Sequence, residues 1–295
     1  MYSQIDSNKR KTALLIGIFL ALIIGLGLTL NQVYGYGYEV VVICVVISSL
    51  MSIFSYYASD KIALASSGAK RITKEENPYL YRMVENLCMS QGMPVPKIHI
   101  INSPALNAFA TGRDPEHASI AFTTGIISAL ENEELEGVIA HELSHVKNYD
   151  IRVMTVVVVL VGAIGLLADF FFRGQFLFGG GDGERRGGHP ALAIIGIVAL
   201  LISPIVAELI KLAISRKREY LADASGALMT RYPEGLARAL EKIAGSDIQL
   251  QNAHAATAHL FISNPLKGKG KSIASLFSTH PPIQERVKRL RGING

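Results

Sequence analysis

Residues 141–150 read His-Glu-Leu-Ser-His-Val-Lys-Asn-Tyr-Asp. The predicted fold must place this stretch on a helix and bring further metal ligands to it. In a helix, residues four apart lie on the same face, so His141 and His145 can share one metal ion. Glu142 lies about 100° round the helix, where its carboxylate reaches a water on the metal instead of the metal itself. Zinc with two histidine ligands and an open position activates water for attack on a peptide carbonyl. The stretch therefore predicts zinc-dependent peptide hydrolysis with Glu142 as the general base.

A third metal ligand has to come from elsewhere in the chain. The longer metzincin motif needs glycine and histidine where Asn148 and Ile151 stand, so the sequence excludes that subclass. Glu219 and Asp223, within residues 219–223 (EYLAD), put two carboxylates one helical turn apart. Such a pair is often only a solvated acidic face. Beside the histidine motif, it favours a second helix that brings one carboxylate to zinc and the other to a histidine.

Two more polar residues are candidates for supporting roles. Asp150 follows His145 closely enough to accept an imidazole N–H and fix the tautomer of that ligand, although a helix-end carboxylate is an equal alternative. His280 precedes the last predicted helix and could contact the tetrahedral intermediate, with a surface histidine as the alternative. No role is predicted for the other histidines, which lack a partner at ligand spacing: His99, His117, His189, His254 and His259.

Four apolar runs are long enough, at about 1.5 Å per residue, to cross or nearly cross a bilayer core of about 30 Å. They comprise residues 13–30, 38–57, 153–172 and 191–214. These runs divide the chain into a first transmembrane hairpin (1–58), the first part of a protease domain (59–152), a second hairpin (153–214) and the second part of the domain (215–295).

The metal site restricts the membrane topology. His145 precedes the third run and Glu219 follows the fourth, so these two runs must both cross the bilayer or both stay out of it. Four crossings place both termini and both halves of the site on one side. Basic clusters at residues 9–11 and 216–218 mark that side as cytoplasmic, although three arginines between the third and fourth runs weaken this assignment slightly.

The overall composition points to lipid and away from nucleic acid. The chain is 49% hydrophobic with a mean hydropathy of +0.31. Its net charge is +5, but the basic residues cluster beside apolar runs and do not interleave with stacking aromatics. Cys44 and Cys88 are too few for a disulfide framework. We therefore expect a lipid bilayer as a partner, and no nucleic acid.

Between the apolar runs, the periodicity predicts helices mixed with a small sheet. A helix is expected near residues 77–91, another starting at 131–136, and a final one within 285–291. Strands are expected at residues 96–101, 107–111 and 119–123. The predicted fold class is mainly α with a small β-sheet (α+β), joined to a four-helix transmembrane anchor.

Four motifs follow one another in a specific order: NAFATGR (107–113), HELSHVKNYD (141–150), EYLAD (219–223) and THPP (279–282). With the four apolar runs, they make the whole chain resemble the HtpX-type heat-shock membrane zinc proteases of bacteria, which are more distantly related to the CAAX prenyl endopeptidases. CAAX processing is less expected, because those relatives are larger, with more membrane spans.

The resemblance implies a gluzincin-like protease domain with one zinc ion per chain. It implies Glu219 as the third ligand, Glu142 as the catalytic base, and quality control of damaged or misfolded membrane proteins during stress. The segment comprising Asn107, Ala108, Phe109 and Ala110 resembles the family's substrate-binding edge strand, which would pair with an extended peptide.

Two other functions are weighed against this one. An intramembrane protease would bury its histidines in an apolar span, whereas charged residues flank His141 and His145 on both sides. A membrane adaptor with structural zinc would close the site with four protein ligands, often including cysteine, and the two cysteines offer no such set. Physiological substrates, cleavage preference and oligomeric state are left open.

Overall fold

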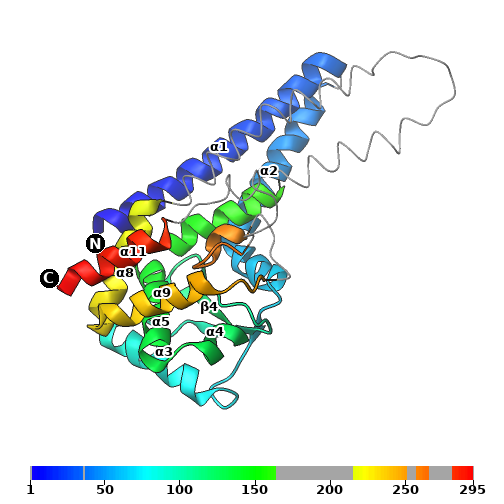
Figure 1. Ribbon diagram of the computed structural model, residues 1–295. Coiled ribbons are helices and arrows are strands. Elements are labelled where there is room, and N and C mark those ends of the chain that lie inside the picture. Colours follow the sequence, from blue (N-terminus) through cyan, green and yellow to red (C-terminus); the bar gives the residue numbers. More distant parts are fainter. Residues whose placement is uncertain (1, 36, 164–214, 251–256, 266–280, 295) are drawn as a thin grey trace, which may run out of the picture.

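The computed structural model describes residues 2–35, 37–163, 215–250, 257–265 and 281–294. The fourth predicted apolar run, residues 164–172 of the third, and His280 lie outside these ranges. Helices dominate the described chain, and a small sheet lies among them (Figure 1). The helices are α1 (Tyr2–Tyr34), α2 (Tyr38–Ser66), α3 (Pro78–Gln91), α4 (Thr124–Ala129), α5 (Asn132–Lys147), α8 (Arg216–Thr230), α9 (Pro233–Gly245) and α11 (Ile283–Arg291). Short 3-10 turns cover Pro115–His117, Ala258–Leu260 and Gly292–Asn294.

Helices α1 and α2 form a hairpin that projects from the rest of the molecule (Figure 1). Each contains a segment long and apolar enough to cross a membrane, at Ile5–Thr29 and Tyr38–Ser66. Both helices are longer than the apolar runs predict, because lysine, arginine and alanine continue a helix readily where hydropathy falls. One face of α2 leaves large apolar side chains exposed, among them Val42, Leu50, Ile53 and Phe54. Lipid would cover such a face.

The chain from residue 150 to residue 163 is also helical and packs along this hairpin. Its buried valines and Leu160 contact Leu15, Phe19 and Ile23 of α1. The Ser55 hydroxyl of α2 donates to the carbonyl of Val156 at 3.4 Å. The described part of the third apolar run therefore lies beside both helices of the hairpin.

The sheet has four strands in the order β1-β2-β4-β3. Their bounds are β1 (Lys70–Arg71), β2 (Lys97–Ile101), β3 (Ala108–Gly112) and β4 (Ala118–Thr123). β2 and β4 are parallel, and the other two pairings are antiparallel, with Ala108 opposite Phe122 and Ala110 opposite Ile120. The three predicted strands are confirmed within one residue or so of their ends, and the mainly helical class with a small mixed sheet is confirmed too. β1 was missed because two residues carry no alternating pattern.

The soluble core forms where helices cover the sheet. Leu80 and Val84 of α3 pack with Ile120 and Phe122 of β4, and with α5. Asn77 is the N-cap residue of α3, and its side chain accepts a hydrogen bond from the Leu80 N–H. α5 is enclosed along most of its length, because α8, α9 and β3 all pack against it. A helix enclosed in this way can hold polar groups in a site shielded from water.

Candidate metal centre

Helix α5 carries His141, Glu142 and His145 in the middle of the molecule. Their exposed fractions are 1%, 2% and 4%, so all three are shielded from water. The helical spacing brings the two imidazoles together edge to face, and their Nε2 atoms lie 3.3 Å apart. Two imidazole nitrogens thus face one point.

Helix α8 brings Glu219 to the same point. Gly226 of α8 lies against α5, and a Cβ there would sit 3.0 Å from the His141 backbone nitrogen, so glycine permits the close packing. The Oε1 atom of Glu219 lies 3.6 Å from Nε2 of His145, and its Oε2 atom lies 3.9 Å from Nε2 of His141. One potential ligand atom from each of these three residues lies within 4.8 Å of the others.

This set of donors fits a divalent metal such as zinc. Two imidazole nitrogens and one carboxylate oxygen are typical ligands of catalytic zinc, and three protein ligands leave a position open. The charges around the point also favour a cation. Burial opposes protonation of His145, yet a hydrogen bond with Asp150 and the charges of Glu219 and Glu142 raise its pKa to about 9.

Behind His141 lies Asp223, one helical turn after Glu219. Its Oδ1 atom is 3.0 Å from Nδ1 of His141. Arg286 of α11 donates to both oxygens of this carboxylate, at 2.8 Å and 2.6 Å. Burial alone would raise the pKa of Asp223, but the Arg286 charge holds it below its usual range. An ionised Asp223 can accept the Nδ1 proton of His141, which leaves Nε2 turned toward the other ligand atoms.

Behind His145 lies Asp150, in a similar position. Its Oδ2 atom is 3.1 Å from Nδ1 of His145. Its Oδ1 atom accepts a hydrogen bond of 2.7 Å from the side-chain amide of Asn8. The Nε atom of Arg218 lies 3.7 Å from the same oxygen. Each histidine of the pair therefore has a carboxylate behind it.

Glu142 projects from α5 beside these residues. Burial raises its pKa to about 7, against the charges of His145 and Arg286, which lower it. A hydrogen bond from the Ala110 backbone of β3 also lowers it. A carboxyl group with a pKa near neutrality can both take up and release a proton at that pH, as a general base and acid must.

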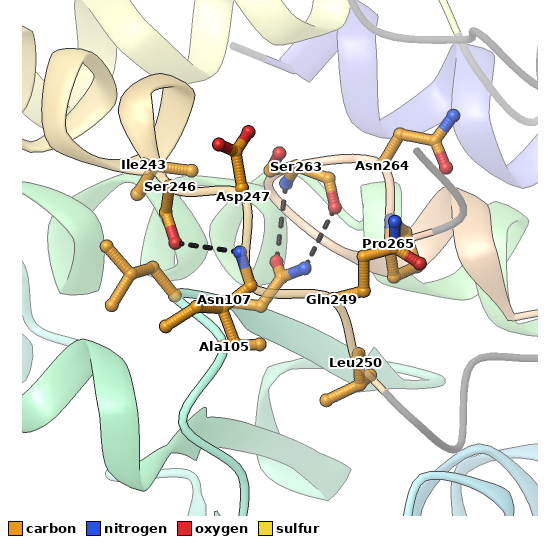
Figure 2. Close-up of a pocket in the computed structure, with 12 residues that line it drawn as sticks. Ala105, Asn107, Ile243, Ser246, Asp247, Gln249, Leu250, Ser263, Asn264 and Pro265 are labelled. Atoms are coloured by element: carbon orange, nitrogen blue, oxygen red, sulfur yellow. Dashed lines mark hydrogen bonds between the residues drawn. The ribbon is translucent and has the colours of Figure 1, made fainter. Parts of the chain in front are cut away.

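Three of the four predicted edge residues, Ala108, Phe109 and Ala110, lie on β3, at one edge of the sheet, and Asn107 directly precedes it. Part of that edge is already paired. The Ala108 carbonyl accepts a hydrogen bond from the Ile262 N–H at 3.0 Å, and Phe109 forms a bridge with Phe261. Figure 2 shows how the Asn107 side chain pairs with the backbone of Ser263, next to a cavity of about 240 Å³. None of the metal-centre residues lines this cavity.

Three residues of the site were missed by the sequence analysis: Asn8, Arg218 and Arg286. Arg286 had a usable signal, because it shares an apolar helical stripe with Ile283, Val287 and Leu290, where a charge is unexpected. Asn8 has no such signal, since one polar residue before an apolar run is ordinary. His280, which was predicted, lies outside the described residues.

Several known proteins are similar to this chain in sequence. Residues 74–294 match the model of peptidase family M48. The chain is 44% identical over 291 residues to a protease HtpX homolog of Tropheryma whipplei (strain Twist), covering 99% of this chain and 98% of the relative. It is 42% identical over 290 residues to a homolog of Dictyoglomus turgidum, covering 98% and 94%. The homolog of Streptococcus uberis is 40% identical over 296 residues, covering 99% of each chain.

A solved structure supports the fold. The crystal structure of S. mikatae Ste24p superposes with a TM-score of 0.51 over 98% of this chain and 67% of that chain. At 18% identity this likeness concerns the fold alone. The family match and the near full-length relatives establish more: the chain is a membrane-associated metalloprotease and belongs to peptidase family M48.

Proposed function

We propose that the chain is a zinc-dependent endopeptidase of the cytoplasmic membrane, which hydrolyses misfolded or damaged membrane proteins. The observation that carries the proposal is the buried convergence of His141, His145 and Glu219 beside Glu142. Two apolar helices continuous with the protease domain support a substrate class found at the bilayer.

In this proposal, His141, His145 and Glu219 hold one zinc ion per chain. Zinc bound there would act as a Lewis acid that polarises the scissile carbonyl. It would also lower the pKa of water, so that the water can lose a proton and attack the carbonyl. Glu142 takes the proton of the attacking water on its carboxylate and passes it to the leaving amine. The carboxylates behind the histidines keep each Nδ1 protonated, so that each Nε2 has a lone pair for the metal.

The substrate would bind as an extended strand along β3, at Asn107, Ala108, Phe109 and Ala110. The packing of β3 against α5 supports this, because it sets the strand beside the helix that carries Glu142. Residues 261–263 already pair with part of the edge. A substrate strand must therefore replace this contact or start beyond it.

For the membrane, we propose four crossings with both termini and the site in the cytoplasm, and boundaries near residues 58, 152 and 214. The packing of residues 150–163 along α1 and α2 supports a third crossing. Fusion of green fluorescent protein or alkaline phosphatase after Gly295 tests the orientation. Fluorescence without phosphatase activity is the expected result, and the reverse would place the site outside the cytoplasm.

The central experiment is cleavage of an unfolded membrane protein by the full chain in detergent, purified under chelator and assayed before and after zinc addition. Glu142→Gln should bind zinc and lose activity by about 10²-fold or more. Glu136→Gln is a matched control, a half-buried glutamate on the same helix outside the site. If zinc restores no cleavage, or if Glu142→Gln cleaves normally, the proposed function or its base is wrong.

A further inference from the structure

Asn8 lies in α1, near the start of the apolar segment that can cross a membrane. Its side chain is fully buried. Its amide nitrogen donates to Oδ1 of Asp150 at 2.7 Å and to the carbonyl of Asn148 at 2.9 Å. Its amide oxygen accepts from Nη1 of Arg218 at 3.4 Å. One side chain of the hairpin thus contacts both segments that flank the metal centre. The N-terminal end of α1 lies beside α8 (Figure 1).

Asp150 depends on this contact for its orientation. It is buried, and its Oδ2 atom is directed at Nδ1 of His145. Its other oxygen has the Asn8 amide at 2.7 Å, whereas Arg218 Nε is farther away at 3.7 Å. A buried carboxylate oxygen that loses its hydrogen-bond donor incurs a desolvation penalty, so the carboxylate would rotate or draw in water. Either change moves Oδ2 away from the histidine.

A second buried polar residue of α1 gives a comparison. The Thr12 hydroxyl donates to the carbonyl of Asn8 at 3.0 Å, within its own helix. That bond serves only the helix, as is common for threonine in membrane helices. Asn8 instead directs both donors of its amide out of the helix, to residues 148 and 150. A polar side chain in a membrane helix is costly unless it has such partners.

We propose that Asn8 is a positioning residue of the metal centre: it orients Asp150, and Asp150 in turn orients His145. The inference rests on the proposed ligand set of His141, His145 and Glu219. It means that the protease site is incomplete without the first membrane helix, which carries one member of the chain of hydrogen bonds that leads to the metal.

The test is the zinc dissociation constant of the full chain in detergent, measured by competition with a chromophoric chelator. Partners behind a metal-bound histidine change metal affinity by about 10- to 100-fold. Asn8 is one step farther out, so we expect Asn8→Ala to raise the dissociation constant by about tenfold. Thr12→Val, on the same helix, should change it by less than about twofold. An unchanged affinity in folded Asn8→Ala would overturn the proposal.

A double-mutant cycle separates positioning from general packing. If Asn8 acts through Asp150, Asn8→Ala should add less than about twofold to the loss of affinity in an Asp150→Ala background. Additive losses would show that Asn8 acts independently, and the proposal would be wrong. Asn8→Leu serves as a second variant if Asn8→Ala does not fold, because it keeps about the same volume in the helix and removes both donors without adding a charge. Melting temperatures under chelator check folding in every case.

One more variant keeps this inference apart from the proposed function. His145→Ala removes a proposed ligand and should abolish tight zinc binding. If it binds zinc as well as the unsubstituted chain, the ligand set itself is wrong. If His145→Ala loses zinc but Asn8→Ala keeps normal affinity, the ligand set stands and only the positioning role fails.

Discussion

His141 and His145 of α5 each have a buried carboxylate beside Nδ1. The two carboxylates are held by different parts of the molecule. Behind His141 stands Asp223, held by Arg286, and both belong to the C-terminal half of the chain. Behind His145 stands Asp150, held by Asn8 of the membrane hairpin. Asp223 has an ion pair with two short hydrogen bonds, whereas Asp150 has one short hydrogen bond from a neutral amide and a longer ion pair with Arg218, at 3.7 Å.

The difference shows that the centre joins the N-terminal hairpin of α1 and α2 to helices from the other end of the chain. Neither half of the sequence holds both histidines in place alone. It also predicts that the two supports fail differently. Loss of Arg286 leaves a buried charge without its counter-ion, whereas loss of a neutral amide leaves the charge balance intact.

The largest effect is expected for Arg286→Met. Removing one partner of a buried ion pair costs about 3–5 kcal/mol, because the other charge stays buried. Thermal unfolding under chelator would show this as a marked fall in melting temperature. Arg218→Met should cost clearly less, since Arg218 lies 3.7 Å from Asp150 and the Asn8 amide remains. Equal losses would contradict the distinction between the two supports.

An intermediate effect is expected when each carboxylate becomes an amide. Asp223→Asn and Asp150→Asn keep the volume, and each should weaken zinc binding by about 10- to 100-fold. Asp223→Asn belongs at the upper end, because Arg286 then loses its nearest counter-ion and keeps only Glu219, at 3.8 Å. Asp150→Asn belongs at the lower end, because the Asn8 amide can turn its oxygen to the new N–H₂ group. Competition with a chelator measures both, and a reversed order would refute the comparison.

The smallest effect concerns the far end of α5. Lys242 of α9 donates to the buried Glu134 at 2.7 Å, and Glu134 also accepts from the Glu131 N–H. Lys242→Ala should cost about 1 kcal/mol or less, since the lysine is partly exposed, and should leave zinc affinity unchanged. A change in zinc affinity would show that the supports are not local to the centre.

The stabilisation that the Lys242–Glu134 contact gives to the fold depends on pH. Burial raises the pKa of Glu134, but Lys242 and the Glu131 N–H bring it below the ordinary value of 4.5. A lowered folded pKa stabilises the fold above the unfolded pKa, and this stabilisation is lost as pH falls through the folded value. The difference between Lys242→Ala and the unsubstituted chain should therefore shrink below about pH 4.5, as melting temperatures can show.

Local patterns in the sequence were enough to predict much of the fold. The helix at 77–91 and the three strands follow from apolar periodicity, and the structure confirms them. The spacing of residues 141–150 was likewise enough to propose a metal site, because one helix brings the two histidines together. Glu219 and Asp223 were found because they lie one turn apart on one helix.

The remaining residues of the centre could not be found this way. Arg286 meets Asp223 across 63 residues of sequence, and Asn8 meets Asp150 across 142. Contacts at such separations depend on how helices pack, which periodicity does not report. The pairing of residues 261–263 with β3 is of the same kind, because three residues are too few to show an alternating pattern.

The short connection after α5 has a further consequence. α5 ends at Lys147, and only Asn148 and Tyr149 separate it from the helix that begins at residue 150 and packs along α1. This two-residue connection keeps the end of α5 close to the hairpin. If the hairpin crosses the bilayer as proposed, the site stays at a constant height above the lipid. Such an enzyme would select a peptide bond by its distance from the membrane surface more than by the side chains on either side of it.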